Sequence, residues 1–216
     1  MLVKQGESVK YKLPGVYDIH TFLSLLQTYV HNRFPGEGVY VPVVRDVFSK
    51  KFGSGTDSLD FSVWDSPGSR DYGRLRPLSY HKTDLFCICF SIVDHESFDE
   101  VKSFWLPEIE SHTMPQTRIL LIGLKTDLRD DPKTIESLQK NNLEPLSYED
   151  GCILSQEIDA IGYLECSAQN EENCDSIFEE VYNFFLDGKK HANDPLYNIH
   201  DYSISVLKSR AKSARK

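Results

Sequence analysis

Residues 64–80 read W-D-S-P-G-S-R-D-Y-G-R-L-R-P-L-S-Y. The alternating apolar side chains of residues 59–63 predict a strand that leads into them and ends at Asp65. Gly68 then allows a tight turn and a close approach of the backbone to a ligand. An acidic residue at the carboxyl end of a strand, followed by a glycine turn, is typical of α/β proteins that face a phosphate–metal site. The pattern favours a nucleotide-binding α/β fold.

Size and charge narrow the class of protein. The chain has 216 residues, of which 40% are hydrophobic, and a net charge of -9. This length suits one compact domain with tails. The acidic balance argues against a general nucleic-acid-binding protein, which needs a basic face. The five cysteines show no metal-like spacing, and Cys87 and Cys89 alternate within an apolar run, so we expect free thiols in the core of a cytoplasmic protein.

The second half of the chain alternates strand and helix patterns. Apolar runs at 85–90 and 119–122 have the length of buried strands, and 163–166 reads as a short third one. Apolar residues at helical spacing predict helices over residues 19–29, 94–112, 148–161 and 170–186. Such alternation predicts a parallel sheet wrapped by right-handed crossovers.

The first quarter of the chain is less regular. Residues 9–13 alternate apolar side chains with lysines, which predicts an edge strand or a hairpin rather than a central parallel strand. Residues 39–48 are rich in β-formers, and 58–64 form the strand before the turn. The sequence Gly-Ser-Gly-Thr at 53–56 between them predicts a hairpin loop.

The string at 64–80 strongly resembles the second switch of Rho-family small GTPases, Rac-like members above all, in which the turn reads D-T-A-G-Q-E. The resemblance covers about residues 24–186. It implies an α/β fold of the Ras-like P-loop NTPase type, a G domain with a mostly parallel six-stranded sheet and helices on both faces. Residues 130–145 resemble the insert helix of Rho proteins. A divergent segment, 1–23, would precede this domain, and a tail that is basic at its end, 187–216, would follow.

The resemblance also implies a site for guanine. The sequence G-L-K-T-D at 123–127 follows an apolar strand and is similar to the family's T-K-x-D motif, whose aspartate accepts from two donors on the edge of guanine. The sequence E-C-S-A at 165–168 matches a loop whose backbone contacts the base oxygen, and F-P-G-E at 34–37 supplies an aromatic ring beside the base. The implied base-binding residues are Phe34, Lys125, Asp127, Ser167 and Ala168.

The phosphate half of the site departs from the family. The pattern G-x-x-x-x-G-K-[ST] that cradles phosphates occurs nowhere in the chain. At its place Val16 and Thr21 replace the glycines, Phe22 replaces the lysine, and Leu23 replaces the hydroxyl that binds Mg²⁺. The abrupt change near residue 24 fits either drift of a once-functional loop or an alternative first segment joined to an ordinary GTPase.

Two further positions of the phosphate site have changed. The first switch reads Y-V-P-V at 40–43, where the family has Y-x-P-T, and Ser69 replaces the glutamine that orients the attacking water. Asp65 and Gly68 remain. Losing three charge-assisted contacts of roughly 1.5–3 kcal/mol each costs about 5–9 kcal/mol, or about four to six orders of magnitude in affinity. We therefore expect weak binding of GTP or GDP at most, no bound Mg²⁺ and no intact catalytic residue.

The exposed part of the second switch matches the family more closely. In Rho proteins this surface meets effectors, exchange factors and GTPase-activating proteins. Together with two residues before it in the chain, this stretch would form the effector and regulator surface here: Tyr40, Asp46, Tyr72, Arg74, Leu75, Arg76 and Leu78.

Three functions are compatible with these residues. The first is a Rho-like binding module, impaired in GTP binding and hydrolysis, that signals through its switch surface. The second is a working Rho-type enzyme that hydrolyses GTP and regulates the actin cytoskeleton and cell polarity. The third is sequestration of Rho regulators. Residues 208–216 carry five positive charges and no cysteine follows Cys174, so we expect no prenyl anchor and at most weak electrostatic membrane contact.

Overall fold

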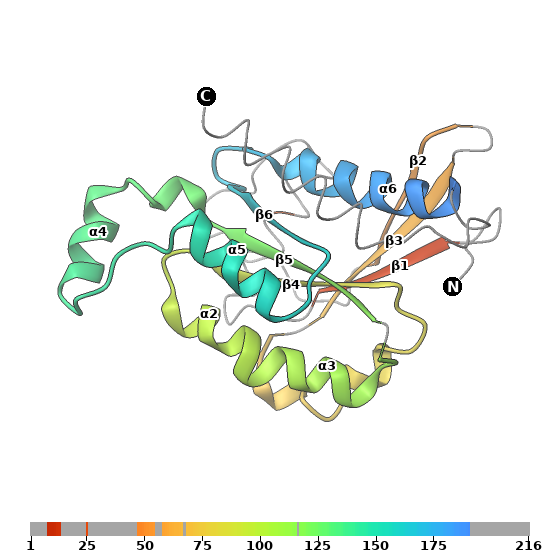
Figure 1. Cartoon of the computed structure of the whole chain (residues 1–216), viewed down its shortest axis with the longest axis horizontal. Helices are drawn as coiled ribbons and strands as arrows, with labels where there is room; N and C mark the ends of the chain where they lie inside the picture. The colour runs from red at the N-terminus through yellow and green to blue at the C-terminus, as the bar shows by residue number, and fades with distance from the viewer. Residues whose placement is uncertain are drawn as a thin grey trace.

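The computed structural model describes residues 8–13, 25, 47–54, 58–66, 68–115 and 117–190. Within these residues six strands form one sheet in the order β2-β3-β1-β4-β5-β6, with helices on both faces (Figure 1). The strands are β1 (Ser8–Leu13), β2 (Val47–Phe52), β3 (Leu59–Asp65), β4 (Leu85–Ser91), β5 (Arg118–Leu124) and β6 (Gly162–Cys166). The helix predicted over 19–29 lies outside the described residues except for Leu25, which is helical and fully buried.

Strand β2 is the antiparallel edge of an otherwise parallel sheet. It pairs with β3 so that Phe52 lies opposite Leu59, and Gly53 begins the connection with a φ of 71°. A positive φ is a conformation that glycine adopts without steric cost. The predicted hairpin is therefore confirmed, but its first strand begins at Val47, and residues 39–46 lie outside the described part of the chain.

Strand β1 lies in the interior of the sheet, so the prediction of an edge strand or hairpin is wrong. All six of its residues pair in parallel with β3, and Tyr11 and Lys12 also pair with Leu85 and Phe86 of β4. Backbone pairing on both sides satisfies N–H and C=O groups whatever the side chains are. The alternating lysines therefore did not reveal the position of this strand.

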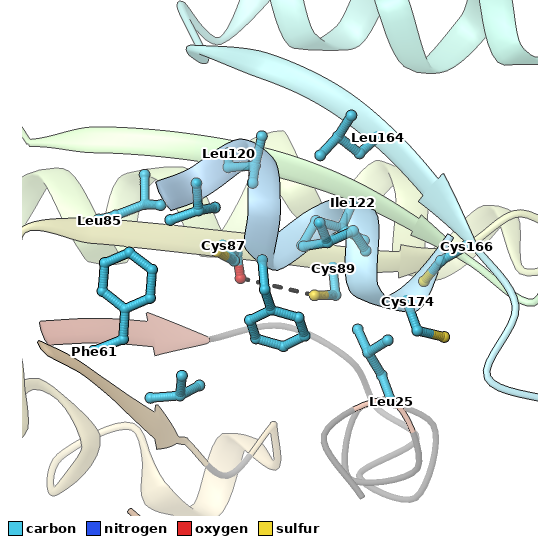
Figure 2. Packing of buried hydrophobic residues seen from close by; sticks show 14 of the residues in the cluster. Leu25, Phe61, Leu85, Cys87, Cys89, Leu120, Ile122, Leu164, Cys166 and Cys174 are labelled. Carbon is cyan, nitrogen blue, oxygen red and sulfur yellow. Dashed lines mark hydrogen bonds between the residues drawn. The ribbon is translucent and has the colours of Figure 1, made fainter. Parts of the chain in front are cut away.

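Strand β4 separates two hydrophobic clusters. Leu85, Cys87 and Cys89 face helix α6 (Cys174–Lys190), as Figure 2 shows, and the residues between them face the opposite side of the sheet. This strict alternation is the period-2 geometry of a strand that is buried on both faces. All five cysteines are free, which confirms the prediction of free thiols, and Cys152 is the one that is only half-buried.

The second cluster is covered by one nearly continuous helical segment that comprises α2 (His95–Glu100), a π-helical turn η4 (Val101–Trp105) and α3 (Leu106–His112). Val101, Trp105 and Ile109 are buried, as the helical spacing predicts. Pro107 has no N–H to donate to the carbonyl four residues earlier, and a widened turn accommodates such a loss. In that turn the N–H of Leu106 donates to the carbonyl of Val101 instead.

Three further helices follow. Helix α4 (Pro132–Gln139) has no buried residue and projects beyond the end of the sheet (Figure 1). Helix α5 (Tyr148–Glu157) begins with a reciprocal cap between Ser147 and Asp150 and covers the same face as α3. Helix α6 covers the opposite face of the sheet. Among the described helices, none combines the length and apolar character needed to cross a membrane.

Two glycines leave room for the ring of Tyr163. A Cβ atom on Gly151, within α5, would collide with the ring itself, and a Cβ on Gly123 would collide with the phenolic oxygen. We expect Gly151→Ala and Gly123→Ala each to lower the free energy of unfolding by about 1–3 kcal/mol through overpacking, although alanine favours a helix more than glycine.

A second substitution separates the two collisions. Tyr163→Phe removes the oxygen but keeps the ring, so it should relieve Gly123→Ala in part and Gly151→Ala much less. Urea denaturation of the single and double variants measures this. Equal relief in both pairs would contradict the described packing.

Candidate functional site

The carboxyl ends of β5 and β6 place the two predicted base-binding loops side by side. Their parallel register pairs Gly123 with Glu165 and Leu124 with Cys166. After β5 the backbone turns at Lys125, which has φ 65° and ψ 42°, into the short 3-10 helix η5 (Thr126–Leu128). The carboxyl edge of a parallel sheet is where open α/β folds bind ligands.

A short hydrogen bond joins the two loops. The hydroxyl of Ser167, which is fully buried, donates to Oδ1 of Asp127 at 2.5 Å. Among the described residues no hydrogen bond engages Oδ2 of Asp127, and the hydroxyl of Thr126 beside it is buried without a partner. The sequence placed Asp127 and Ser167 in the site but did not predict that their side chains hold each other.

A second contact between the loops involves residues that the sequence analysis did not identify. The guanidinium of Arg129 donates to both oxygens of Glu165, at 2.8 and 2.7 Å, and to the carbonyl of Leu146 at 3.1 Å. The phenol of Tyr163 donates to Glu165 at 2.6 Å. The hydrogen bonds to Glu165 raise the pKa of Arg129, and burial raises that of Tyr163, so the guanidinium keeps its charge and the phenol its proton. This network fixes the distance between η5 and β6.

The loop after β6 is closed by its own backbone. Ser167 and Glu172 exchange two backbone hydrogen bonds, at 3.0 and 2.9 Å, and the Ser167 hydroxyl accepts from the N–H of Asn170 at 3.0 Å. The thiol of Cys174 donates to the carbonyl of Ser167 at 3.3 Å. Ala168 lies within this loop, half-buried against the core. The loop that would contact the base is therefore preorganised.

The phosphate half of the site is only partly described. Predicted residues that lie outside the described part of the chain are Val16, Thr21, Phe22, Leu23, Phe34, Tyr40 and Asp46. Asp65 ends β3 and Gly68 is buried, as expected for the turn, but the side chain of Asp65 is not described. The Ser69 hydroxyl caps η2 (Arg70–Tyr72): it accepts from the N–H of Asp71 at 3.3 Å and lies 3.2 Å from Oδ2 of Asp71.

Residues 68–80, called the turn segment below, are held to α3 by a buried ion pair. Arg76, whose side chain has no exposed surface, donates to both oxygens of Glu108, at 2.8 and 2.7 Å. Its third contact is the carbonyl of Ser69 at 2.9 Å, and its guanidinium lies 4.7 Å from the centre of the Trp105 ring. The prediction that Arg76 belongs to the exposed surface is therefore wrong.

Tyr80 completes this network. Its hydroxyl donates to Glu108 at 2.5 Å. Burial alone would raise the pKa of Glu108, but the hydrogen bonds and charge of Arg76, with the bond from Tyr80, hold it below its ordinary value. Burial and the neighbouring Glu108 raise the pKa of Tyr80. The carboxylate thus stays ionised and accepts every hydrogen bond offered to it.

A second ion pair lies at the start of the turn segment. Arg70 donates to Glu100 at 2.6 Å, and its guanidinium lies 4.9 Å from the centre of the Phe104 ring. Three apolar side chains lie in solvent between or just after the two attached arginines: Tyr72, Leu75 and Leu78 are 46%, 51% and 77% exposed. Arg74 is exposed beside them. Four of the predicted surface residues therefore do lie at the surface.

Acidic residues on the helix under the turn segment were not predicted as part of the site. Glu100 and Glu108 both lie in the helical segment from α2 to α3, whose apolar spacing drew attention to the core. The signal in the sequence is that each glutamate is adjacent to a predicted core residue, Val101 or Ile109. A carboxylate buried at such a position requires a positive partner. The sequence offers several arginines and does not say which one is the partner.

The sequence matches a known protein family. A family model described as "Ras: Ras family" matches residues 23–186. The matched range includes the base-binding loops, the turn segment and the helices under it.

The Arg76–Glu108 pair makes a pH-dependent contribution to stability. The pKa of Glu108 in the folded protein is lower than its ordinary value of 4.5. The stabilisation is therefore complete above about pH 4.5 and is lost as the pH falls through the folded pKa. We expect Glu108→Gln, which leaves Arg76 buried without a counter-charge, to cost about 3–5 kcal/mol at neutral pH. Urea denaturation should show that difference shrinking below pH 4; a difference independent of pH would contradict the ionic role.

The Arg129–Glu165 ion pair between the two predicted base-binding loops can be tested in the same way. Arg129→Gln removes a bidentate, largely desolvated pair and should lower the free energy of unfolding by about 2 kcal/mol. Lys102→Gln is the matched control, because the Lys102–Glu157 pair is about half exposed and should contribute below 1 kcal/mol. Equal effects of the two substitutions would show that the network does not hold the loops.

Proposed function

The chain belongs to the Ras family of small GTPases, and from this premise we propose that it is a Rho-type signalling protein, weak in nucleotide binding and hydrolysis, that acts through its turn segment. Ras-family proteins generally bind GTP or GDP with Mg²⁺ and interact with regulators and effectors. The turn segment corresponds to the second switch of the family. What is proposed here is the Rho type, the loss of nucleotide handling and the mode of action.

Helix α4 supports the Rho type. It lies between η5 and α5, where the resemblance to Rho proteins predicts their insert helix. Asp131 caps it by accepting from the N–H and hydroxyl of Thr134 at 2.8 and 2.7 Å. Because none of its residues is buried, it adds nothing to the core. An exposed helix that does not contribute to the core is consistent with a surface for binding a partner.

The residues present fit a guanine base better than a nucleotide's phosphates. The two base-binding loops are locked to each other, and Oδ2 of Asp127 has no hydrogen bond from the described residues. On the phosphate side, the sequence offers Phe22 and Leu23 where a lysine and a hydroxyl are needed. Phosphoryl transfer relies almost entirely on such positioned donors and on Mg²⁺. Such a site would select guanine but bind its phosphates weakly.

The hydrolytic step is also poorly supported. The family's glutamine holds the attacking water, and Ser69 stands at its place. The Ser69 hydroxyl is engaged with Asp71 in the same turn, so it serves local structure. We infer slow hydrolysis for any GTP that binds.

The observation that carries the proposal is the turn segment itself. Its apolar side chains Tyr72, Leu75 and Leu78 are exposed on a segment that the bidentate Arg76–Glu108 ion pair holds to α3. Family members reorder this region when a γ-phosphate binds. Here side-chain pairs supply the order, so the surface can be presented without nucleotide to effectors or regulators. We propose a cytoplasmic location, which the free cysteines favour.

A working Rho-type switch is the second candidate, and the match of the predicted base-binding loops to the family motifs favours it. Such a protein would hydrolyse GTP and regulate the actin cytoskeleton and cell polarity. It would require residues 1–23 to supply a phosphate site by another route.

Isothermal titration with GDP and a GTP analogue, with and without Mg²⁺, separates the two candidates. We expect affinity weaker than the family's by about four orders of magnitude or more, little affected by Mg²⁺. Asp127→Asn should abolish any residual heat, since it replaces an acceptor oxygen by a donor. Tight, Mg²⁺-dependent binding of one GDP per chain would establish the second candidate instead.

A further inference from the structure

We propose that Arg70 and Glu100 form a latch that holds the turn segment on the α2–α3 helical segment in one conformation, independently of nucleotide. The functional meaning of the latch rests on the proposed function, in which this segment is the interaction surface. Its existence is a property of the protein alone and can be tested alone.

The contact is close and asymmetric in burial. Arg70 Nη2 lies 2.6 Å from Glu100 Oε1, and the two side chains are 58% and 6% exposed. The guanidinium also lies 4.9 Å from the centre of the Phe104 ring, one helical turn further along. A half-exposed arginine therefore reaches down to a buried carboxylate and covers an aromatic ring on the way.

The buried carboxylate of Glu100 favours the conformation in which Arg70 is bound. Glu100 has lost nearly all of its hydration, and an ionised carboxylate in that state requires a positive partner. Swinging the turn segment away would separate Glu100 from Arg70 and require water to enter. The helix thus favours the conformation in which Arg70 is bound.

The latch and the Arg76–Glu108 pair act on opposite ends of the same segment. Arg70 opens η2, and Arg76 opens the following 3-10 helix η3 (Arg76–Ser79). Their carboxylate partners lie on one helical segment. Arg76 also donates a hydrogen bond to the carbonyl of Ser69, the residue before Arg70. The exposed apolar side chains lie between or just after these two attachments, so their positions are set by both.

Arg70 differs in charge from the residue at the same place in the Rho-family turn that this stretch resembles. The family pattern D-T-A-G-Q-E places a glutamate where Arg70 stands. A glutamate there would repel Glu100, whereas an arginine pairs with it. Two residues at the end of the turn differ from this pattern. Ser69 stands in place of the glutamine and caps η2. Arg70 stands in place of the glutamate and forms an ion pair with Glu100.

Hydrogen exchange of the full chain without nucleotide tests the latch. The reporters are the amides of Tyr72, Gly73 and Leu75, which donate within the turn segment to the carbonyls of Ser69, Arg70 and Tyr72. Arg70→Gln and Glu100→Gln should each speed their exchange about five- to tenfold, and the double variant should exchange no faster than the faster single one. Adding GDP and Mg²⁺ to the wild type should leave the rates unchanged.

Two controls keep the outcome interpretable. Lys102→Gln breaks an exposed ion pair of the same helical segment and should leave these amides unchanged. Amides of β4 and β5 report whether each variant still folds. Unchanged exchange in both single variants, or additive effects in the double variant, would overturn the latch. Tight GDP binding by titration would refute the proposed function but would leave these exchange rates as they are.

Discussion

The bidentate pair between Arg76 and Glu108 is the interaction on which the described surface depends. It places a full positive charge in a position with no exposed surface, above the ring of Trp105. Such a pair is costly to desolvate and strongly destabilising to break, so it adds little net stability but selects one arrangement sharply. The backbone from Ser69 to Tyr80 follows from it, because Ser69, Arg76 and Tyr80 all bond within the same network. The turn segment is thereby held in one arrangement against the α2–α3 helical segment.

A second set of side-chain contacts joins the carboxyl ends of β5 and β6. Arg129 and Glu165 join the loops after β5 and β6, and Ser167 bonds to Asp127 within that frame. These contacts fix the predicted base-binding groups relative to each other, and such preorganisation lowers the entropic cost of binding a ligand. The phosphate side has no comparable frame in the sequence. The proposed function follows from this difference between the predicted base-binding half of the site and its phosphate-binding half.

Much of the fold could be predicted because strands β4 and β5 are buried on both faces and leave a continuous apolar run. The helix from 94 to 112 could be predicted from Val101, Trp105 and Ile109, although the π-helical turn near Pro107 could not. Strand β1 was misplaced, because its position depends on backbone pairing with β3 and β4 and not on its side-chain pattern. In the site, single residues such as Asp127 were recognisable from motifs. The pairings of Arg76, Arg70 and Arg129 were not, since an ion pair joins residues about thirty positions apart that no local pattern connects.

The central claim is that the protein presents an ordered interaction surface without a bound nucleotide. The most direct test is to denature freshly purified protein and quantify the released guanine nucleotide by chromatography against protein concentration. We expect far less than one nucleotide per chain in a sample whose turn segment is nevertheless protected from trypsin at Arg70 and Arg74. One GDP or GTP per chain, with loss of that protection when the nucleotide is removed, would contradict it.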